Sequence, residues 1–175
     1  LIDAQGHDLP LRLRGEAHSG GDTRMLVLSE ASESFVFEDI DAEPAPSILR
    51  GFSAPVTVDN GLSDAQLLHL LAHDGDAFNR WEAGQQLALR PDGPVSPTPL
   101  DAAFVDAMRA VLRHPTLDAA LKELVLTLPA ETYVAEQLDE VDPQRIHAVR
   151  ETMREQLAEA LETDWAWAYE AHKDN

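Results

Sequence analysis

The chain has 175 residues, enough for one ordinary domain or two small ones, and 44% of them are hydrophobic, which is sufficient for a packed core. Its 32 acidic and 13 basic residues give a net charge of −19, which argues against nucleic-acid and anionic membrane partners. We expect this acidity to form a solvated surface; the alternative is attraction of cationic substrates, such as peptides with a free N-terminal amine. Without cysteine the chain forms no disulfides, which fits a cytoplasmic location.

The sequence also shows no membrane or targeting segment. No apolar run reaches the roughly 18 residues that a membrane helix needs, and no signal-peptide pattern is present. The chain starts at Leu1-Ile2-Asp3 without an initiator Met, and this start resembles the interior of a strand. We therefore expect a piece of a longer protein.

The first third of the sequence has the pattern of short β-strands separated by turns. Apolar and charged residues alternate over residues 9–14, which is the period of a half-buried strand, and β-forming residues follow. The expected strands are residues 9–14, 25–28, 34–38 and 47–59, the last an edge strand or bulge because it contains Pro55. We predict a partial β-sandwich domain over residues 1–60, because about five strands are too few to close a sandwich.

From Ser63 onward the hydrophobic period is helical. Ser63 and Gln66 form a capping box ahead of a leucine-rich first helix. Later helices are expected after Gly75, from Thr98-Pro99, from Thr116, from Pro129 to Leu138, and from Asp142-Pro143. Antiparallel helices with short loops indicate an all-α bundle or solenoid-like domain over residues 61–175. The predicted fold class of the whole chain is α+β.

His69 and His73 are the strongest candidate for a metal site. Their i, i+4 spacing on a helix is typical of zinc ligands. However, Leu70 stands where a zinc peptidase has its general-base Glu, and spacing indicates no third ligand. We predict a solvated helix face, and we assign no catalytic, cofactor-binding or metal-binding residue in the chain.

Three other motifs have ordinary structural explanations. Asp74-Gly75-Asp76 begins like a calcium loop but lacks the later Gly and Glu, so we predict a turn between helices. Residues 19–22 lack the Lys of a phosphate-binding loop, and we predict a hairpin turn. The aromatic residues Trp165, Trp167 and Tyr169 are expected in core or interdomain packing; if exposed, they would form a docking patch.

Several sequence segments resemble bacterial aminopeptidase N, a family of zinc-dependent gluzincin exopeptidases. The segments are GFSAPV at residues 51–56, FNRWEA at 78–83, FVDAMRAVL at 104–112 and VDP at 141–143. In that family, a thermolysin-like catalytic domain is followed by a β-sandwich and a large helical domain that limits access to small peptides. The chain resembles the seam between the two non-catalytic domains.

The resemblance implies that the reactive part of the enzyme lies outside this sequence. None of the seven histidines is followed by Glu, so the zinc-binding H-E-x-x-H motif is absent, as is the amine-binding G-A-M-E-N segment. The family pattern also continues the second helix beyond Arg90, so residues are expected to be missing between Arg90 and Pro91. The implied partners are the catalytic domain of the same parent chain and its peptide substrates; the implied zinc belongs to the parent.

We therefore predict a non-catalytic, architectural fragment of a zinc aminopeptidase. The alternatives are a stand-alone α-helical protein-binding module and a self-contained hydrolase that uses His69 and His73. Two packing predictions follow from the motifs. Phe52 is expected between the strand and helix layers, and Trp81 is expected to be buried with Phe78 and Leu89.

Overall fold

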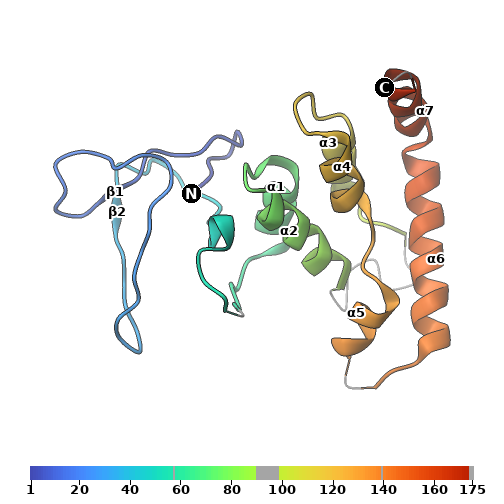
Figure 1. The fold of residues 1–175 in the computed structure, drawn as a ribbon, viewed down its shortest axis with the longest axis horizontal. Coiled ribbons are helices and arrows are strands. Elements are labelled where there is room, and N and C mark those ends of the chain that lie inside the picture. Colours follow the sequence, from blue (N-terminus) through green and yellow to red (C-terminus); the bar gives the residue numbers. More distant parts are fainter. Residues whose placement is uncertain (57, 90–98, 139, 174–175) are drawn as a thin grey trace.

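The computed structural model describes residues 1–56, 58–89, 99–138 and 140–173. Figure 1 shows extended loops with a short sheet at one end of the molecule and helices at the other. We call residues 1–60 the N-terminal part and residues 61–175 the helical part. Helices α1 and α2 lie beside the N-terminal part, α3 and α4 lie beyond them, and the long helix α6 lies at the far side (Figure 1).

The N-terminal part has a small sheet among its described residues. Strand β1 (Arg12–Leu13) pairs antiparallel with β2 (Phe37–Glu38), and Arg12 lies opposite Glu38. Isolated bridges join Ile2 to Asp8 and to Ala45, which holds the start of the chain against its own loop. The predicted α+β class is confirmed, and two of the predicted strand segments contain a true strand.

The other two predicted strands are wrong. Residues 25–28 form no strand, and their side chains are exposed, with Met25 at 81%. An apolar run becomes a strand only when another strand completes its hydrogen bonds, and the described residues supply none here. The segment 47–59 contains a 3-10 turn, η1 (Arg50–Phe52), in which Leu49, Gly51 and Phe52 have positive φ.

The described helical part consists of seven α-helices, with no helix long and apolar enough to cross a membrane. They are α1 (Asp64–His73), α2 (Ala77–Leu89), α3 (Ala102–Leu112), α4 (Ala119–Leu126), α5 (Glu131–Glu136), α6 (Pro143–Ala160) and α7 (Glu162–His172). The predicted capping box is confirmed, because the Ser63 hydroxyl accepts from the Gln66 N–H and the Gln66 side chain accepts from the Ser63 N–H. The predicted start of α6 is also confirmed, with Asp142 as its cap.

Three predicted helix starts are wrong by a few residues. Pro99 precedes α3, which is capped by Asp101, and the predicted cap Thr98 lies outside the described residues. Thr116 lies in the turn before α4, whose cap is Asp118. Similarly, α5 is shorter than the predicted 129–138 segment. At α3 and α4, an Asp carboxylate caps the helix in place of the predicted Thr hydroxyl. The predicted gap between Arg90 and Pro91 also lies outside the described residues.

A continuous hydrophobic core joins α1 to α4 and α6. Its largest fully buried side chains within the helical part include Leu67, Leu71, Val111, Val125 and Leu161. Helices α1 and α2 approach closely at Gly84, where an added Cβ would lie 3.3 Å from a Leu71 methyl carbon.

The predicted aromatic packing is only partly correct. Trp81 is half-buried rather than buried, although it packs against the core. Phe78 remains 36% exposed, and Leu89 is half-buried. Phe52 is 71% exposed, so it lies on the surface and not between layers. Apart from Leu87, the buried positions of α2 are instead taken by small and polar residues, among them Arg80.

Candidate functional site

The N-terminal part and the first two helices meet through a set of charged and polar side chains. We call this set the polar junction; it consists of Asp8, Ser47, Arg50, Asp74, Asp76, Asn79 and Arg80. Two of its charged members are almost completely buried, since Asp74 is 1% and Arg80 2% exposed. Buried charges need close partners, so the geometry of this set determines how the two parts are held together.

Arg50 connects both parts of the chain from its position in η1. Its Nη2 donates to Asp8 Oδ1 at 2.6 Å and to Asp74 Oδ1 at 3.1 Å, while its Nε donates to Ser47 Oγ at 2.7 Å. Burial alone lowers the pKa of Arg50, but hydrogen bonds and charge from Asp8 and Asp74 outweigh it and raise the pKa. Arg50 therefore stays charged and ties a loop near the N-terminus to the end of α1.

Asp74 and Asp76 shape the turn between α1 and α2. Asp74 Oδ1 accepts from the Asp76 N–H at 2.9 Å, and Asp76 Oδ1 accepts from Phe78 N and Asn79 N, each at 3.0 Å. The second Asp76 oxygen accepts from Gly51 N at 2.9 Å. This geometry agrees with the predicted turn between helices and not with a calcium loop, since the carboxylate oxygens of Asp74 and Asp76 accept from backbone N–H groups. Asp74 Oδ2 is buried without a hydrogen-bond partner in the described part of the chain.

Arg80 binds the carboxyl end of α1 from inside the protein. Its Nε and Nη2 donate to Asp74 O at 3.0 and 2.6 Å, and its Nη1 donates to Leu71 O at 3.2 Å and Ala72 O at 2.7 Å. These carbonyls have lost their helical partners at the helix end, and they carry its partial negative charge. Burial lowers the pKa of Arg80, partly offset by the charge of Asp74.

Asn79 completes the junction from the first turn of α2. Its Nδ2 donates to Ser47 Oγ and to Ile48 O, both at 2.9 Å. Next to it, the ring of Phe78 lies 4.5 Å from that of Phe52 and 5.5 Å from that of Trp81, measured between centroids. Within the motif at residues 78–81, Phe78 and Asn79 therefore contact the N-terminal part, while Arg80 and Trp81 contact residues of the helical part.

His69 and His73 lie beside the polar junction, at a second contact with the N-terminal loop. His69 Nε2 lies 2.7 Å from the carbonyl oxygen of Asp3, and the two imidazole centroids are 4.8 Å apart. Gly6 packs on the His73 ring so closely that a Cβ there would lie 2.7 Å from it. Burial, and then the charge of His69, lower the pKa of His73. The predicted solvated face holds for His73, which is exposed, and is corrected for His69, which is half-buried beneath the N-terminal loop.

The histidine pair does not fit a zinc site. One nitrogen of His69 is already engaged by a backbone carbonyl, and zinc needs about three protein ligands. Across the described ranges, no group of three or more His, Asp or Glu side chains could hold a metal ion. The zinc that the family resemblance implies therefore has no ligand set among these residues.

The remaining motifs lie elsewhere on the surface. Leu11 and the glycines at 20 and 21 exchange backbone hydrogen bonds of 2.7 and 3.0 Å, which fits the predicted hairpin turn over residues 19–22. Trp165 and Trp167 are each 39% exposed and Tyr169 is 70% exposed, so the predicted core packing is wrong for these residues. Trp167 instead lies under the guanidinium of Arg113, 4.7 Å from the ring centroid.

The sequence prediction singled out Asp74 and Asp76 as a turn but did not identify Asp8, Arg50 or Arg80 as members of the polar junction. One signal could have found Arg80, because it precedes Ala83, Gly84 and Leu87 by three, four and seven residues on the apolar face of α2. A cationic side chain on the apolar face of a helix is expected to be buried, and the free carbonyl groups at the end of a neighbouring helix are suitable partners for it. Arg50 and Asp8 lie far apart in the sequence, and no spacing rule connects them.

Two family models match the chain, and together they cover nearly all of it. Residues 1–61 match the domain of unknown function DUF3458, described as an Ig-like fold, and residues 64–175 match its C-terminal partner DUF3458_C, described as ARM repeats. These descriptions agree with a short sheet followed by packed helices.

Named relatives connect the chain to aminopeptidases. It is 34% identical to aminopeptidase N of Escherichia coli K12 over 181 residues and 35% identical to that of Haemophilus influenzae over 176 residues, covering 98% and 97% of this chain. The crystal structure of Legionella pneumophila aminopeptidase A in complex with aspartic acid is similar over 75% of this chain and 16% of that one, with 30% identity and a TM-score of 0.65.

The chain spans only a part of these proteins, 20% of the length of each aminopeptidase N. The resemblance recognised from the sequence motifs is confirmed over nearly the whole chain. The chain belongs to the DUF3458 family, through its Ig-like and ARM-repeat models, and is homologous to a non-catalytic part of bacterial aminopeptidase N.

Proposed function

We propose that the chain is an architectural part of a zinc-dependent aminopeptidase that removes N-terminal amino acids from peptides. Its partners would be the catalytic domain of the same polypeptide and, through that domain, peptide substrates. The observation that carries the proposal is the 34–35% identity over almost the whole chain to a fifth of aminopeptidase N. The catalytic groups and the zinc would lie in the remaining length of the parent.

The polar junction gives this role a physical basis. A part that encloses or positions a catalytic domain must hold its own two portions at a fixed angle. Arg50, Asn79 and Arg80 form charge-assisted or amide hydrogen bonds across or beside the boundary, and Arg80 is nearly inaccessible to water. We therefore propose domains at residues 1–60 and 61–175 that move as one unit in the parent. A bacterial, cytoplasmic parent is part of the same proposal, supported by the bacterial relatives and the lack of cysteine.

An activity assay on the purified 175-residue chain tests the architectural role. With added Zn²⁺ and aminoacyl anilides we expect no turnover, and elemental analysis of the protein as isolated is expected to show no stoichiometric zinc. Zinc catalysis needs several ligands, an open position for water and a placed base. Turnover that disappears in His69→Ala would contradict the proposal and identify a self-contained hydrolase.

The parent polypeptide supplies the complementary test. We expect it to hydrolyse the same anilides, and we expect Arg50→Met in the parent to shorten the half-life of activity on heating. Arg24→Met is the matched control, because Arg24 pairs with Glu16 inside the N-terminal part and does not reach the helices. A parent without aminopeptidase activity would favour the stand-alone binding module.

A further inference from the structure

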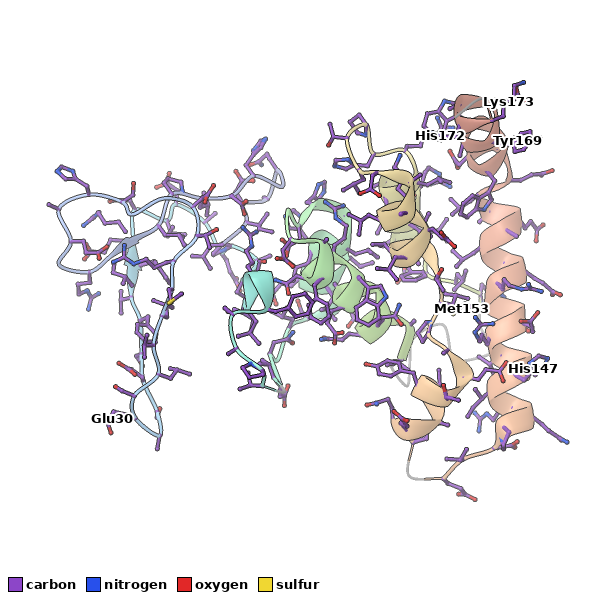
Figure 2. All side chains as sticks on the ribbon, in the orientation of Figure 1. Glu30, His147, Met153, Tyr169, His172 and Lys173 are labelled. Carbon is purple, nitrogen blue, oxygen red and sulfur yellow. The ribbon has the colours of Figure 1, made fainter. Side chains whose placement is uncertain are left out.

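The boundary between the N-terminal part and the helical part falls on an Asn-Gly step. Asn60 and Gly61 follow the exposed Asp59 and precede Ser63, the cap of α1. Figure 2 shows the loop that connects η1 to α1 on the side of α1 and α2 that faces away from α6. Gly61 is exposed and Asn60 is half-buried, so water reaches this step. We call residues 59–62 the Asn-Gly loop.

An asparagine that precedes a glycine is open to attack by the backbone that follows it. A bond between the Gly61 nitrogen and Cγ of Asn60 closes a five-membered ring, because only the carbonyl carbon, Cα and Cβ of Asn60 separate the two atoms. A side chain on the following residue crowds the attacking nitrogen, and glycine has none. Gly61 has a φ of +59°, and a Cβ built on it would meet no atom within 4 Å, so the space around it is open.

Two hydrogen bonds of the Asn-Gly loop activate the two reacting groups. Asp59 Oδ1 accepts from the Gly61 N–H at 3.3 Å, which places a carboxylate against the proton that the nitrogen must lose. Asn60 Oδ1 accepts from the Leu62 N–H at 3.1 Å, which polarises the carbonyl that is attacked. Leu62 is 8% exposed and belongs to the hydrophobic core, so its N–H is held in place. The loop therefore holds a base on the nucleophile and a donor on the electrophile.

We propose that Asn60 is a self-modification site, at which the folded chain converts this asparagine to aspartate and isoaspartate with Asp59 as the general base. The Gly61 nitrogen gives its proton to Asp59 and bonds to Asn60 Cγ, while the Leu62 N–H stabilises the oxyanion. The bond from Cγ to the side-chain nitrogen then breaks, and ammonia leaves with the proton that Asp59 returns.

Hydrolysis of the ring completes the reaction. Water that attacks Cγ of the succinimide gives aspartate at position 60, and water that attacks the main-chain carbonyl gives isoaspartate. One water is consumed and one ammonia is released for each Asn60 that reacts, with no oxidation or reduction. The exposed Asp59 and Gly61 give water access to the ring.

Asn79 has none of these features and is an internal control. The residue that follows it is Arg80, whose N–H donates to Asp76 O at 3.0 Å within the first turn of α2. The side-chain nitrogen of Asn79, which would have to leave, donates two hydrogen bonds to the N-terminal part. We expect Asn79 to persist while Asn60 reacts.

The modification would change the boundary between the two parts of the chain. Either product adds one negative charge to the net charge of −19. Isoaspartate also inserts a methylene into the main chain directly before Leu62 and Ser63, which anchor and cap the start of α1. The start of α1 would therefore loosen as the protein ages. This inference does not depend on the proposed function.

Peptide mapping of the folded chain during incubation at neutral pH tests the proposal. Mass spectrometry follows the mass gain of deamidation at Asn60 and Asn79, and labelling by a protein-isoaspartate methyltransferase measures isoaspartate. A synthetic peptide of residues 58–64 gives the rate without the fold, as does the chain in urea. We expect Asn60 to react about tenfold faster in the folded chain than in the peptide, a modest contribution for a positioned general base.

Asp59→Ala tests the assigned base. In the folded chain we expect this variant to deamidate about tenfold more slowly than the wild type, and in the peptide to change the rate by less than about twofold. Asn60→Gln is the blank, because a glutamine would have to close a larger ring. Circular dichroism checks that both variants are folded, and the comparison of folded with urea-unfolded wild type needs no substitution.

Three results would overturn the proposal. If Asn60 reacts no faster in the folded chain than in the peptide or in urea, the loop does not activate it. An unchanged rate in folded Asp59→Ala would remove Asp59 as the base. Deamidation of Asn79 at the rate of Asn60 would show that the hydrogen bonds of the Asn-Gly loop do not select the site.

Discussion

At the scale of single residues, buried charges determine how the parts of this molecule are held together. Arg80 donates to three backbone carbonyls at the end of α1. Asp164 at the start of α7 accepts from Arg109 of α3 and from Arg113, the residue that follows α3. Both side chains are almost completely buried. Their partners come from neighbouring helices, so each charge holds two elements in register.

Replacing Arg80 by Lys is expected to destabilise the protein although the charge is kept. A single ammonium cannot reproduce the fork of donors that reaches Leu71, Ala72 and Asp74. Carbonyls left without partners in the interior cost about 1–3 kcal/mol each, so we expect a loss of about 2–3 kcal/mol in the free energy of unfolding. Urea denaturation measures this loss, with Arg154→Lys as the control because Arg154 is exposed and pairs with Glu151 on the surface. Equal midpoints for the two variants would contradict this account of Arg80.

Asp164 is expected to make stability depend on pH at the acid end. Hydrogen bonds from Arg113 and then Arg109 hold the pKa of Asp164 below its usual value, in spite of burial. The unfolded chain therefore binds the proton more tightly, and stability from this group is present above about pH 4 and is lost as the pH falls further. Thermal unfolding of the wild type and Asp164→Asn should differ at pH 7, and the difference should shrink as the pH falls from about 4 through the lowered pKa of the folded state. A difference that persists unchanged at low pH would show that the carboxylate charge is not the cause.

The sequence could identify some of these residues and not others. The positions of Asp74 and Asp76 between two helical patterns were enough to predict a turn. The pairing of Arg50 with Asp8 was not predictable, because it depends on how 42 residues of intervening loop fold back. Leu70 distinguishes the histidine pair from the zinc-peptidase motif in the sequence, but the contact of His69 with Asp3 comes from the same long-range folding and was not predictable.

At the scale of elements, helix caps explain both the correct and the wrong boundaries. Ser63 and Gln66 form a reciprocal box, a pattern specific enough to locate the start of α1. At α3 and α4 the sequence offers a Thr and an Asp within a few residues of each other, and either side chain can cap a helix. The structure uses Asp101 and Asp118, and Asp is the better capping residue of the two.

The capping box of α1 is expected to stabilise the whole helical part. Ser63→Ala removes the hydroxyl that accepts from the Gln66 N–H and should cost about 1 kcal/mol, while Ser63→Gly should cost less because Gly tolerates the cap conformation. Differential scanning calorimetry of both variants measures the order of stability. If the Ala variant unfolds at the wild-type temperature, the box does not contribute in this context.

The strands show where prediction from the sequence fails, because a strand depends on partners elsewhere in the chain. Residues 25–28 have strong strand propensity but remain exposed, because a strand requires a neighbouring strand to complete its hydrogen bonds. The predicted all-α character of residues 61–175, by contrast, depends on local periodicity, and the described part of that segment is helical as expected.

At the scale of the whole molecule, the polar junction connects two parts that differ in structure. Within the described residues, the buried hydrophobic side chains of the N-terminal part are Ile2, Leu11 and Ala45, so this part has little core of its own. It contacts α1 and α2 through hydrogen bonds of Arg50, Asn79 and His69. An architectural role in an aminopeptidase requires that this contact persist in solution, because a freely moving N-terminal part could not position the helices.

Backbone ¹⁵N relaxation of the 175-residue chain tests this central claim most directly. We predict one rotational correlation time for ordered amides in residues 1–56 and in the helices, because the junction leaves no free linker between them. In a variant carrying both Arg50→Met and Asn79→Ala, the two parts should separate into faster and slower tumbling groups. Two distinct correlation times in the wild-type chain would contradict the account, since the two parts would then move independently despite the contacts between them.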